Sequence, residues 1–409
     1  MSRTIIDVHI LQTVPPSNIN RDDTGAPKSA VYGGVRRSRV SSQAWKKATR
    51  KAFEELLDPA ELGVRTKKVV DTLTERIIAR EESLRAVKAE QVWPMAAELI
   101  HAATGAKIET PTRKTTAKGN KAGAAEDIVE PQAPQSSYLL FLSARQLDAL
   151  AELAIEGIAK KAEPKVFLKE SDVKARAKKA AATRHSVDIA LFGRMVADTT
   201  DINVDAAAQV AHALSVHPVD LETDYFTAVD DQNSDAESGA GMIGTVDFNS
   251  ATLYRYAAVD VDLLAKNLDA GLADEERSGE PVRRAVEAFI EGFALSMPTG
   301  KLNTFGNNTL PDAVVVKLRS ARPISFVGAF ENPIAQGDTS EGHVRAACQA
   351  LAEHIPAVEG AFGAPADHTW IVRVGKQTQE LASLGEQVNL RELVTKVGEV
   401  VADRLGKRG

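Results

Sequence analysis

The chain has a single cysteine, Cys348, among its 409 residues, which excludes a fold held together by disulfides. No run of 18 or more apolar residues occurs, so the sequence predicts no transmembrane helix and no membrane partner. The first residues, Thr4 to Leu11, are strand-like and lack the charged start and apolar core of a secretory signal. These absences predict a cytoplasmic protein.

Catalytic motifs are also scarce. The eight histidines never occur as His-x-x-x-His or beside paired carboxylates, and neither a Gly-x-Ser-x-Gly motif nor a Walker loop is present. We therefore expect no metal, no cofactor and no enzymatic activity. One acidic pair, Asp22-Asp23, lies near basic residues. Neighbours on an extended chain point in opposite directions and cannot easily share a metal, so loop-shaping acids that pair with Arg21 or Arg36 are the favoured interpretation.

Positive charge is concentrated near the N-terminus. The first 51 residues contain ten Lys/Arg and three Asp/Glu, although the whole chain has a net charge of −6. A Gly33-Gly34 turn, a basic run and a Ser41-Ser42 pair that opens a helix follow one another, and each is a feature that can bind phosphate. Lys46 and Arg50 share one helix face, with Gln43 one turn earlier. The pattern indicates a polyanion site; a solvated loop and an ordinary amphipathic helix are the alternative.

Other segments differ sharply in composition. Thr104 to Ser137 nearly lacks large apolar residues and predicts a mobile loop. Lys160 to Arg184 has nine Lys/Arg and three acids, which fits either a second basic surface or a solvated helix. Ala197 to Ser238 has ten acids and no Lys or Arg, and its polar end, from Gln232 to Gly244, is typical of a hairpin tip.

The remaining pattern alternates between strands and helices, which suggests an α/β or α+β sandwich. The expected strands are 138–143, 245–259, 313–318 and 369–374, and the expected helices are 144–161, 281–295, 342–354 and 389–405. Residues 60–103 are expected to be helical.

Three separated blocks carry a family resemblance. The first comprises Ile5 to Leu11, Asn20-Arg21-Asp22, Gly33-Gly34, Arg37, Arg39, Ser41-Ser42-Gln43, Lys46 and Arg50. The second comprises Val187 to Met195, Ala211-His212-Ala213 and Tyr225 to Asp231, and the third runs from Gly244 through Phe248 to Tyr256. In this order they resemble the CasC family, the backbone subunit of the type I-E CRISPR Cascade complex.

The resemblance implies an α+β fold: a modified RRM-like (ferredoxin-like) palm with a helical fingers insertion and a β-hairpin thumb. The expected ranges are palm 1–59, fingers 60–190 with a mobile loop at 104–137, palm/web 191–212, thumb 213–245 and palm 246–409. It also implies several partners, namely a CRISPR guide RNA, target DNA paired to that guide, neighbouring copies of the chain and other Cascade subunits.

Site residues follow from the same resemblance. The palm would contact RNA through Arg21, Lys28, Arg37, Arg39, Ser41, Gln43, Lys46 and Arg50. The thumb would wedge bases apart with Met195, Tyr225, Phe226, Val229 and Ile243, for each of which a core role is the alternative. The acidic face of the thumb could suit the basic surface of a neighbouring copy. A Gly-rich loop with Gly300 and Lys301 is either a phosphate contact or a plain helix-to-strand loop.

Two other functions stay open. Related subunits of type III systems cut RNA with a loop aspartate, so a metal-dependent nuclease using Asp22 or Asp23 is one alternative. A stand-alone single-strand binding protein is the other.

Overall fold

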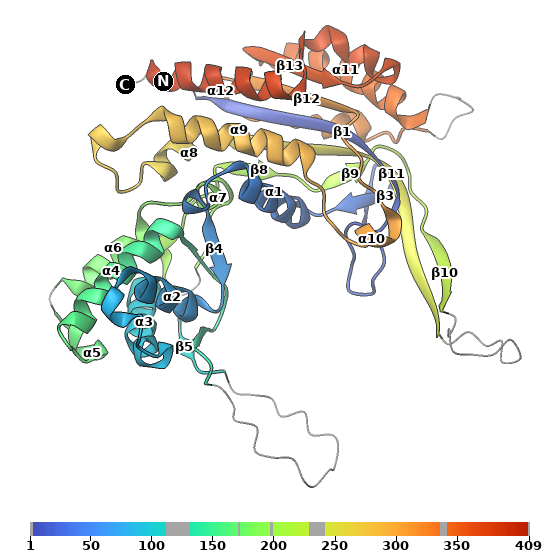
Figure 1. Ribbon diagram of the computed structural model, residues 1–409. Helices are drawn as coiled ribbons and strands as arrows, with labels where there is room; N and C mark the ends of the chain where they lie inside the picture. Colours follow the sequence, from blue (N-terminus) through green and yellow to red (C-terminus); the bar gives the residue numbers. More distant parts are fainter. Residues whose placement is uncertain are drawn as a thin grey trace, which may run out of the picture. The chain divides into compact units, whose positions relative to one another are not determined.

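The computed structural model describes residues 3–111, 131–170, 172–196, 199–228, 242–335 and 342–407 (Figure 1). The chain divides into two compact units. The first, called the sheet unit here, comprises Met1–Leu56, Ala208–Leu264 and Ser278–Gly409. The second, called the helical unit, comprises Leu57–Ala207 and Ala265–Arg277. The domain ranges expected from the sequence stay a prediction.

A ten-stranded sheet forms the centre of the sheet unit, and the long strand β1 (Ile5–Ser17) lies in its middle. The strand order is β14-β13-β12-β1-β11-β9-β3-β2, and β8 and β10 also pair with β11. All pairs are antiparallel except β13 with β14, so the sheet is mixed. The other strands are β2 (Ser29–Tyr32), β3 (Val35–Val40), β8 (Ala208–Val210), β9 (Ala213–Ser215), β10 (Glu222–Ala228), β11 (Met242–Asp260), β12 (Ala313–Arg319), β13 (His368–Arg373) and β14 (Glu386–Gln387).

Helices cover both faces of this sheet. On one face, Arg255 of β11 contacts Trp45 of α1 (Ser42–Leu56) and Phe293 of α9 (Gly279–Leu295). On the other face, Tyr254 of β11 belongs to an apolar cluster with Cys348 of α11 (Gly342–Phe362). Because β1 is covered on both sides, Ile5 to Leu11 is buried without interruption. The unit also contains α10 (Leu302–Phe305) and α12 (Leu390–Gly406), and α8 (Val261–Leu268) leads into the helical unit.

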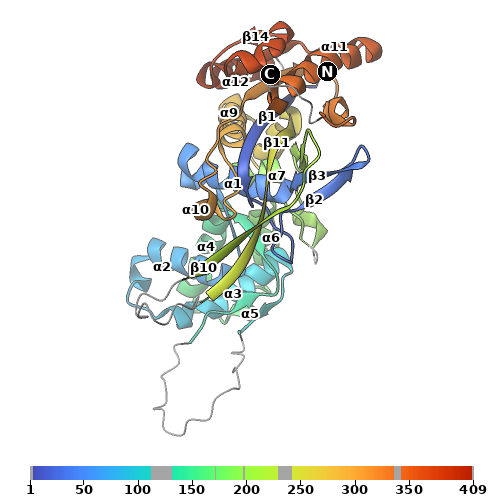
Figure 2. The same ribbon diagram turned by 90° about the vertical axis from the view of Figure 1, so that its right-hand side faces the viewer.

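The sheet unit extends one long hairpin. Strand β10 pairs with the first half of β11, and Figure 2 shows this two-stranded ribbon continuing away from the body of the sheet. Its described strands end at Ala228 and Met242. The segment expected to form the hairpin tip lies mostly outside the described residues.

The helical unit packs its helices around one apolar cluster that includes Leu73, Leu99 and Leu150. Its helices are α2 (Val69–Arg80), α3 (Ala89–Thr104), α4 (Ala144–Ala159), α5 (Pro164–Phe167), α6 (Val173–Ala182) and α7 (Val187–Phe192). Two short strand pairs, β4 (Gly63–Thr66) with β7 (Leu140–Ser143) and β5 (Ile108–Glu109) with β6 (Gln135–Ser136), complete it. The ends of the expected loop at 104–137 are therefore a paired ladder, and residues 112–130 lie outside the described part.

Candidate nucleic-acid interface

The expected anion-binding helix is α1, and two polar side chains build its start. The Ser41 Oγ accepts a hydrogen bond from the Ala44 N–H at 3.3 Å, and the Asn20 Oδ1 accepts one from the Ser41 N–H at 2.8 Å. Ser41 is only 5% exposed. Ser41 therefore caps the helix, and the RNA contact expected for it stays a prediction.

Positive groups gather around the first turn of α1. An Arg39 Nη1–H donates to Nδ1 of His212 at 3.3 Å, and the Ser42 N–H faces the same nitrogen at 3.4 Å. Partial burial, Arg39 and Lys28 together lower the pKa of His212, so the ring is neutral at pH 7 and its Nδ1 is an acceptor. Arg39, Lys28 and the helix start thus leave a net positive site, the geometry that favours a phosphate.

The same helix continues this positive surface. Gln43 is exposed, while Lys46 and Arg50 are half-buried one turn apart. Partial burial lowers the pKa of Lys46. The inward face of α1 is anchored by buried residues, namely Trp45, Thr49 and Phe53. The two cations are thus presented from a helix whose other face is fixed in the core.

Arg37 has a structural role. It is 0% exposed, and its guanidinium donates to the carbonyls of Tyr32 at 3.2 Å, Ser215 at 2.9 Å and Phe330 at 2.8 Å. These bonds join the β2–β3 hairpin to β9 and to the segment before Glu331. The guanidinium is thus used by the protein itself, and the RNA contact expected for Arg37 stays a prediction.

The Gly33-Gly34 turn packs mainly against backbone of the same protein. Gly33 has φ +59°, and a Cβ there would lie 1.7 Å from the carbonyl oxygen of Glu331. Gly34, at φ +79°, faces open space. The first glycine is therefore required by a close approach of protein backbone, and only the second leaves room for a ligand.

Asp22 shapes the loop between β1 and β2. Its Oδ1 accepts hydrogen bonds from the Thr24 hydroxyl at 2.7 Å, the Thr24 N–H at 2.9 Å and the Ala26 N–H at 3.1 Å. The hydrogen bond from the Thr24 hydroxyl is the main cause of the lowered pKa of Asp22. Asp22 thus shapes the loop through hydrogen bonds from Thr24 and Ala26. The pairing with Arg21 or Arg36 that the sequence suggested is not what holds it. Arg21 and Asp23 are exposed on the same loop.

The Gly300-Lys301 loop packs against the same segment. A Cβ on Gly300 would lie 2.5 Å from the Ile19 carbonyl oxygen and 2.6 Å from that of Asn18. Lys301 is half-buried, in a left-handed conformation at φ 51°, directly before α10. This loop therefore lies beside the residues that lead to Asn20 and the start of α1.

The hairpin carries exposed apolar side chains. Tyr225 is 71% exposed, Phe226 41% and Ile243 60%. Phe226 is paired with Gly244 in the ladder, and its ring lies over that glycine. None of the three lies in the core, the alternative considered from the sequence; Val229 lies outside the described residues.

Strand alternation divides these side chains between the two faces of the hairpin. Tyr225 is opposite Thr245, and Ile243 is opposite Thr227, so Tyr225 and Ile243 share one face. Phe226 points to the other face, with the exposed acids Glu222 and Asp224. The hairpin can therefore present apolar groups on both sides.

Comparisons with known proteins identify the family of the chain. A family model described as CT1975-like protein (Cas_CT1975) matches residues 6–396. The chain belongs to this Cas family. A chain of a solved structure described as "CRISPR RNA-guided surveillance complex, pre-nicking" is 31% identical, with a TM-score of 0.76 over 97% of this chain and 100% of that chain. A chain of another "CRISPR RNA-guided surveillance complex" is 28% identical, with a TM-score of 0.67 over 96% and 99%. No curated protein matches the sequence.

In this Cas_CT1975 chain, Met195 belongs to the helical unit, whereas the hairpin belongs to the sheet unit. Met195 is 87% exposed. The preceding Arg194 is buried and donates to the carbonyls of Ile202, Phe141 and Ala181. Arg194 thus fixes the backbone from which Met195 points into solvent.

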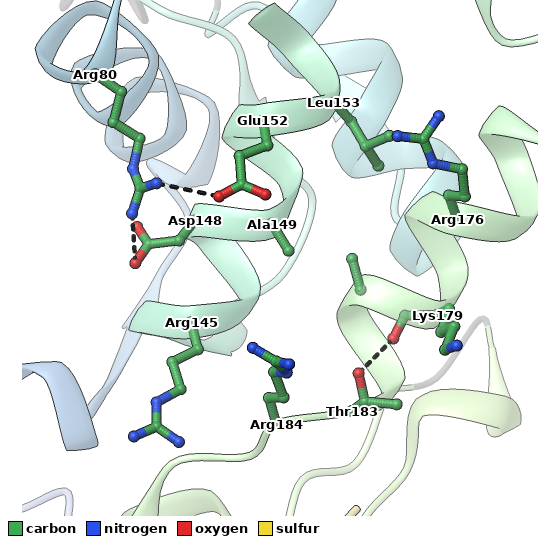
Figure 3. Close-up of a pocket in the computed structure, with 11 residues that line it drawn as sticks. Arg80, Arg145, Asp148, Ala149, Glu152, Leu153, Arg176, Lys179, Thr183 and Arg184 are labelled. Atoms are coloured by element: carbon green, nitrogen blue, oxygen red, sulfur yellow. Dashed lines mark hydrogen bonds and ion pairs between the residues drawn. The ribbon is translucent and has the colours of Figure 1, made fainter. Parts of the chain in front are cut away.

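The basic run at 160–184 divides into paired and exposed cations. Lys160 and Arg176 both form ion pairs with Glu156. Arg176 also lines a pocket of about 550 Å³ in which Arg80 pairs with Asp148 and Glu152 (Figure 3). Further exposed cations at this pocket are Arg145, Lys179 and Arg184. The run is therefore neither a uniform basic surface nor a fully neutralised helix.

His212 was not among the site residues expected from the sequence, yet it lies at the start of α1. The sequence feature that could have pointed to His212 is its place in the block Ala211-His212-Ala213. A single histidine there could not be assigned a contact, because β9 and α1 meet only in the folded sheet unit. No helix in the described part of this family member is long and apolar enough to cross a bilayer.

Proposed function

We propose that this Cas_CT1975 chain is the guide-RNA-binding backbone subunit of a type I-E Cascade surveillance complex. The observation that carries the proposal is the similarity, over 97% of this chain, to a chain of a CRISPR RNA-guided surveillance complex. Its partners would be a guide RNA, target DNA paired to it, other Cascade subunits and neighbouring copies of itself.

The sheet unit would be a modified RRM-like palm. In support, the order β12-β1-β11-β9 is antiparallel, α1 follows the first of these strands in sequence and α9 precedes the last. This is the arrangement of a βαββαβ ferredoxin-like core. The helical unit would be the fingers, and the β10–β11 hairpin the thumb.

The palm would grip the sugar-phosphate backbone without reading sequence. The residues that the structure leaves at least partly exposed are Arg21, Lys28, Arg39, Gln43, Lys46 and Arg50, with Lys301 on the adjoining loop. Arg37 and Ser41 would support the grip indirectly, because their polar groups are engaged by the protein itself. Contacts to phosphate give affinity and salt dependence but carry no sequence information.

The thumb would pass over the guide towards a neighbouring copy and flip bases out at regular intervals. The exposed apolar groups on both faces of the hairpin, Tyr225, Phe226 and Ile243, support this role, because base contacts need apolar or aromatic surfaces. The bases between would stay free to pair with target DNA, so that pairing, not protein, reads sequence.

The subunit itself would cut neither guide nor target. Asp22 is engaged by its own loop, as described above. In the described residues, no group of three or more His, Cys, Asp or Glu side chains is placed to hold a metal. The nuclease alternative therefore gains no specific support, and we assign target cleavage to another protein.

The decisive experiment measures the size of the purified protein with and without a guide RNA of defined length. We expect discrete particles in which the number of copies grows in steps with guide length. Binding of unrelated single strands with no defined stoichiometry would favour the stand-alone single-strand binding protein instead. A failure to bind RNA at all would reject the proposal.

A further inference from the structure

Arg255 is a guanidinium buried inside the sheet unit. It lies on β11 opposite Ile10 of β1 and is 0% exposed. Within the described residues, no carboxylate forms an ion pair with it. Burial lowers the pKa of Arg255 to about 9, which leaves the group charged at neutral pH. A buried cation without a counter-ion is costly, so its presence calls for an explanation.

Two aromatic rings and a helix end hold this guanidinium. Its carbon lies 3.7 Å from the centroid of the Trp45 ring and 4.6 Å from that of Phe293. One Nη donates to the carbonyl of Phe293, in the last turn of α9. A cation is favoured both over an aromatic face and at the C-terminal end of a helix dipole. Arg255 thereby connects α1, through Trp45, to α9.

The other Nη of Arg255 connects it to strand β1. It donates to Oε1 of Gln12 on β1 at 2.6 Å. The amide nitrogen of Gln12 donates in turn to the carbonyl of Thr309 at 2.8 Å and contacts Met297 Sδ at 3.3 Å. Met297 and Thr309 flank the Gly300–Asn308 loop, so one buried group joins both elements to which the proposed function assigns phosphate contacts.

We propose that Arg255 is a positioning residue for RNA binding, which fixes α1 and the Gly300–Asn308 loop relative to one another so that Lys46 and Lys301 can engage neighbouring phosphates of one strand. The inference rests on the proposed function. Arg255 itself touches no RNA, because it is fully buried. Its effect passes through Trp45 on one side and Gln12 on the other.

The test compares Arg255→Met and Arg255→Lys in the full-length chain, with a guide-length RNA as the probe. Thermal melting checks that each variant is folded. RNA affinity is then measured at several salt concentrations, at a temperature below the melting transition. We expect Arg255→Met to bind roughly tenfold more weakly while it remains folded, a change of one decade in the dissociation constant. The slope of log affinity against log salt should stay as in the wild type, because no phosphate contact is removed.

Arg255→Lys keeps the charge but not the planar stack, so we expect it to recover part of the affinity. Lys46→Ala is the matched comparison, because it removes a phosphate contact and should flatten the salt slope. If Arg255→Met does not fold, Gln12→Met, which removes the amide that links Arg255 to Thr309, should reproduce the loss of affinity.

Wild-type affinity in a folded Arg255→Met protein, or in a folded Gln12→Met protein, would overturn the inference. A wild-type chain that binds no RNA would instead reject the proposed function on which it rests. The two failures are thus distinguishable.

Discussion

Lys46 and Arg50 illustrate how helix packing can prepare a charge for a ligand. Both side chains are half-buried, and Trp45 and Thr49 beside them are fully buried. A cation held against protein has already lost part of its hydration and its rotamer freedom. It therefore loses less when it meets a phosphate than a freely solvated lysine would.

The double substitution Lys46→Ala with Arg50→Ala should weaken binding of all RNA sequences alike. The log–log slope against salt should become less steep by about 0.7 for each phosphate of a single strand that the protein no longer neutralises. Salt titrations with several unrelated RNAs check this. The control is Lys47→Ala with Lys51→Ala, the same change of charge at two exposed positions of the same helix, with the same spacing. Equal effects of the two pairs, or weaker binding of only certain RNA sequences, would contradict the assignment.

His217 links the stability of the sheet unit to pH. Its Nε2 accepts from the Thr252 N–H at 3.1 Å and its Nδ1–H donates to the Pro218 carbonyl at 2.7 Å, which requires a neutral ring. The His343 ring stacks on it at 3.8 Å. Burial is the main cause that lowers the pKa of His217 to about 4.

Because the folded pKa lies below the unfolded value of about 6.5, the unfolded chain binds the extra proton first. The contribution of His217 is therefore complete above pH 6.5 and is lost as the pH falls towards 4, with a size on the order of 3 kcal/mol. Urea unfolding between pH 7 and 4 should show a steeper loss for the wild type than for His217→Gln. Parallel curves for the two proteins would refute this linkage.

The β10–β11 hairpin carries exposed apolar side chains that do not contribute to the core of the isolated chain. Phe226→Ala should leave thermal stability almost unchanged, because Phe226 is 41% exposed and its ring lies over Gly244 outside the core. If the ring packs on a base, its removal should cost roughly 1–3 kcal/mol per site in the RNA complex. Ordered stacking of copies along a long guide should suffer more than binding of one copy.

Tyr225→Ala tests the opposite face of the same hairpin, and Thr245→Ala, across the ladder from Tyr225, is the control. Counting copies per guide by mass measurement separates assembly from single-copy binding. Normal assembly by both aromatic variants would remove the wedge role from the hairpin.

Elements with strong local signals were predictable from the sequence. Helix α12 begins at a capping box of Asn389 and Glu392 and has helical periodicity, so its expected start at residue 389 is within one residue of the structure. Short strands such as β8 and β9 have no such signal, because three residues obtain their stability from neighbours on β11 and β3. Local sequence does not encode those neighbours.

The structural surroundings of the expected site residues could be predicted only in part. An arginine in a basic run is expected on the surface, yet Arg37 is buried because carbonyls from three separate segments converge on it. In the sequence, Gly33 and Gly300 suggest openings for a ligand, yet each faces backbone distant in sequence. Such convergence is a tertiary property, which explains why neither the burial of Arg37 nor the contact of His212 with α1 follows from the sequence.

For the whole molecule, the question is whether the proposed RNA binding is accompanied by RNA cleavage. Cleavage by a metal-dependent nuclease needs carboxylates free to hold a cation. The Oδ1 atom of Asp22 accepts three hydrogen bonds within its own loop, so this oxygen is already engaged by the protein. Asp23 next to it is exposed.

The purified chain should therefore leave guide and target RNA or DNA intact in Mg²⁺ or Mn²⁺. Asp23→Ala should leave folding and RNA binding unchanged, whereas Asp22→Ala should loosen the loop before β2, because it removes the acceptor that Thr24 and Ala26 share. Gel analysis of labelled strands checks the first statement, and limited proteolysis of the loop checks the second. Reproducible cleavage by the wild type that either substitution abolishes, while RNA binding in the same samples persists, would show the chain to be a nuclease.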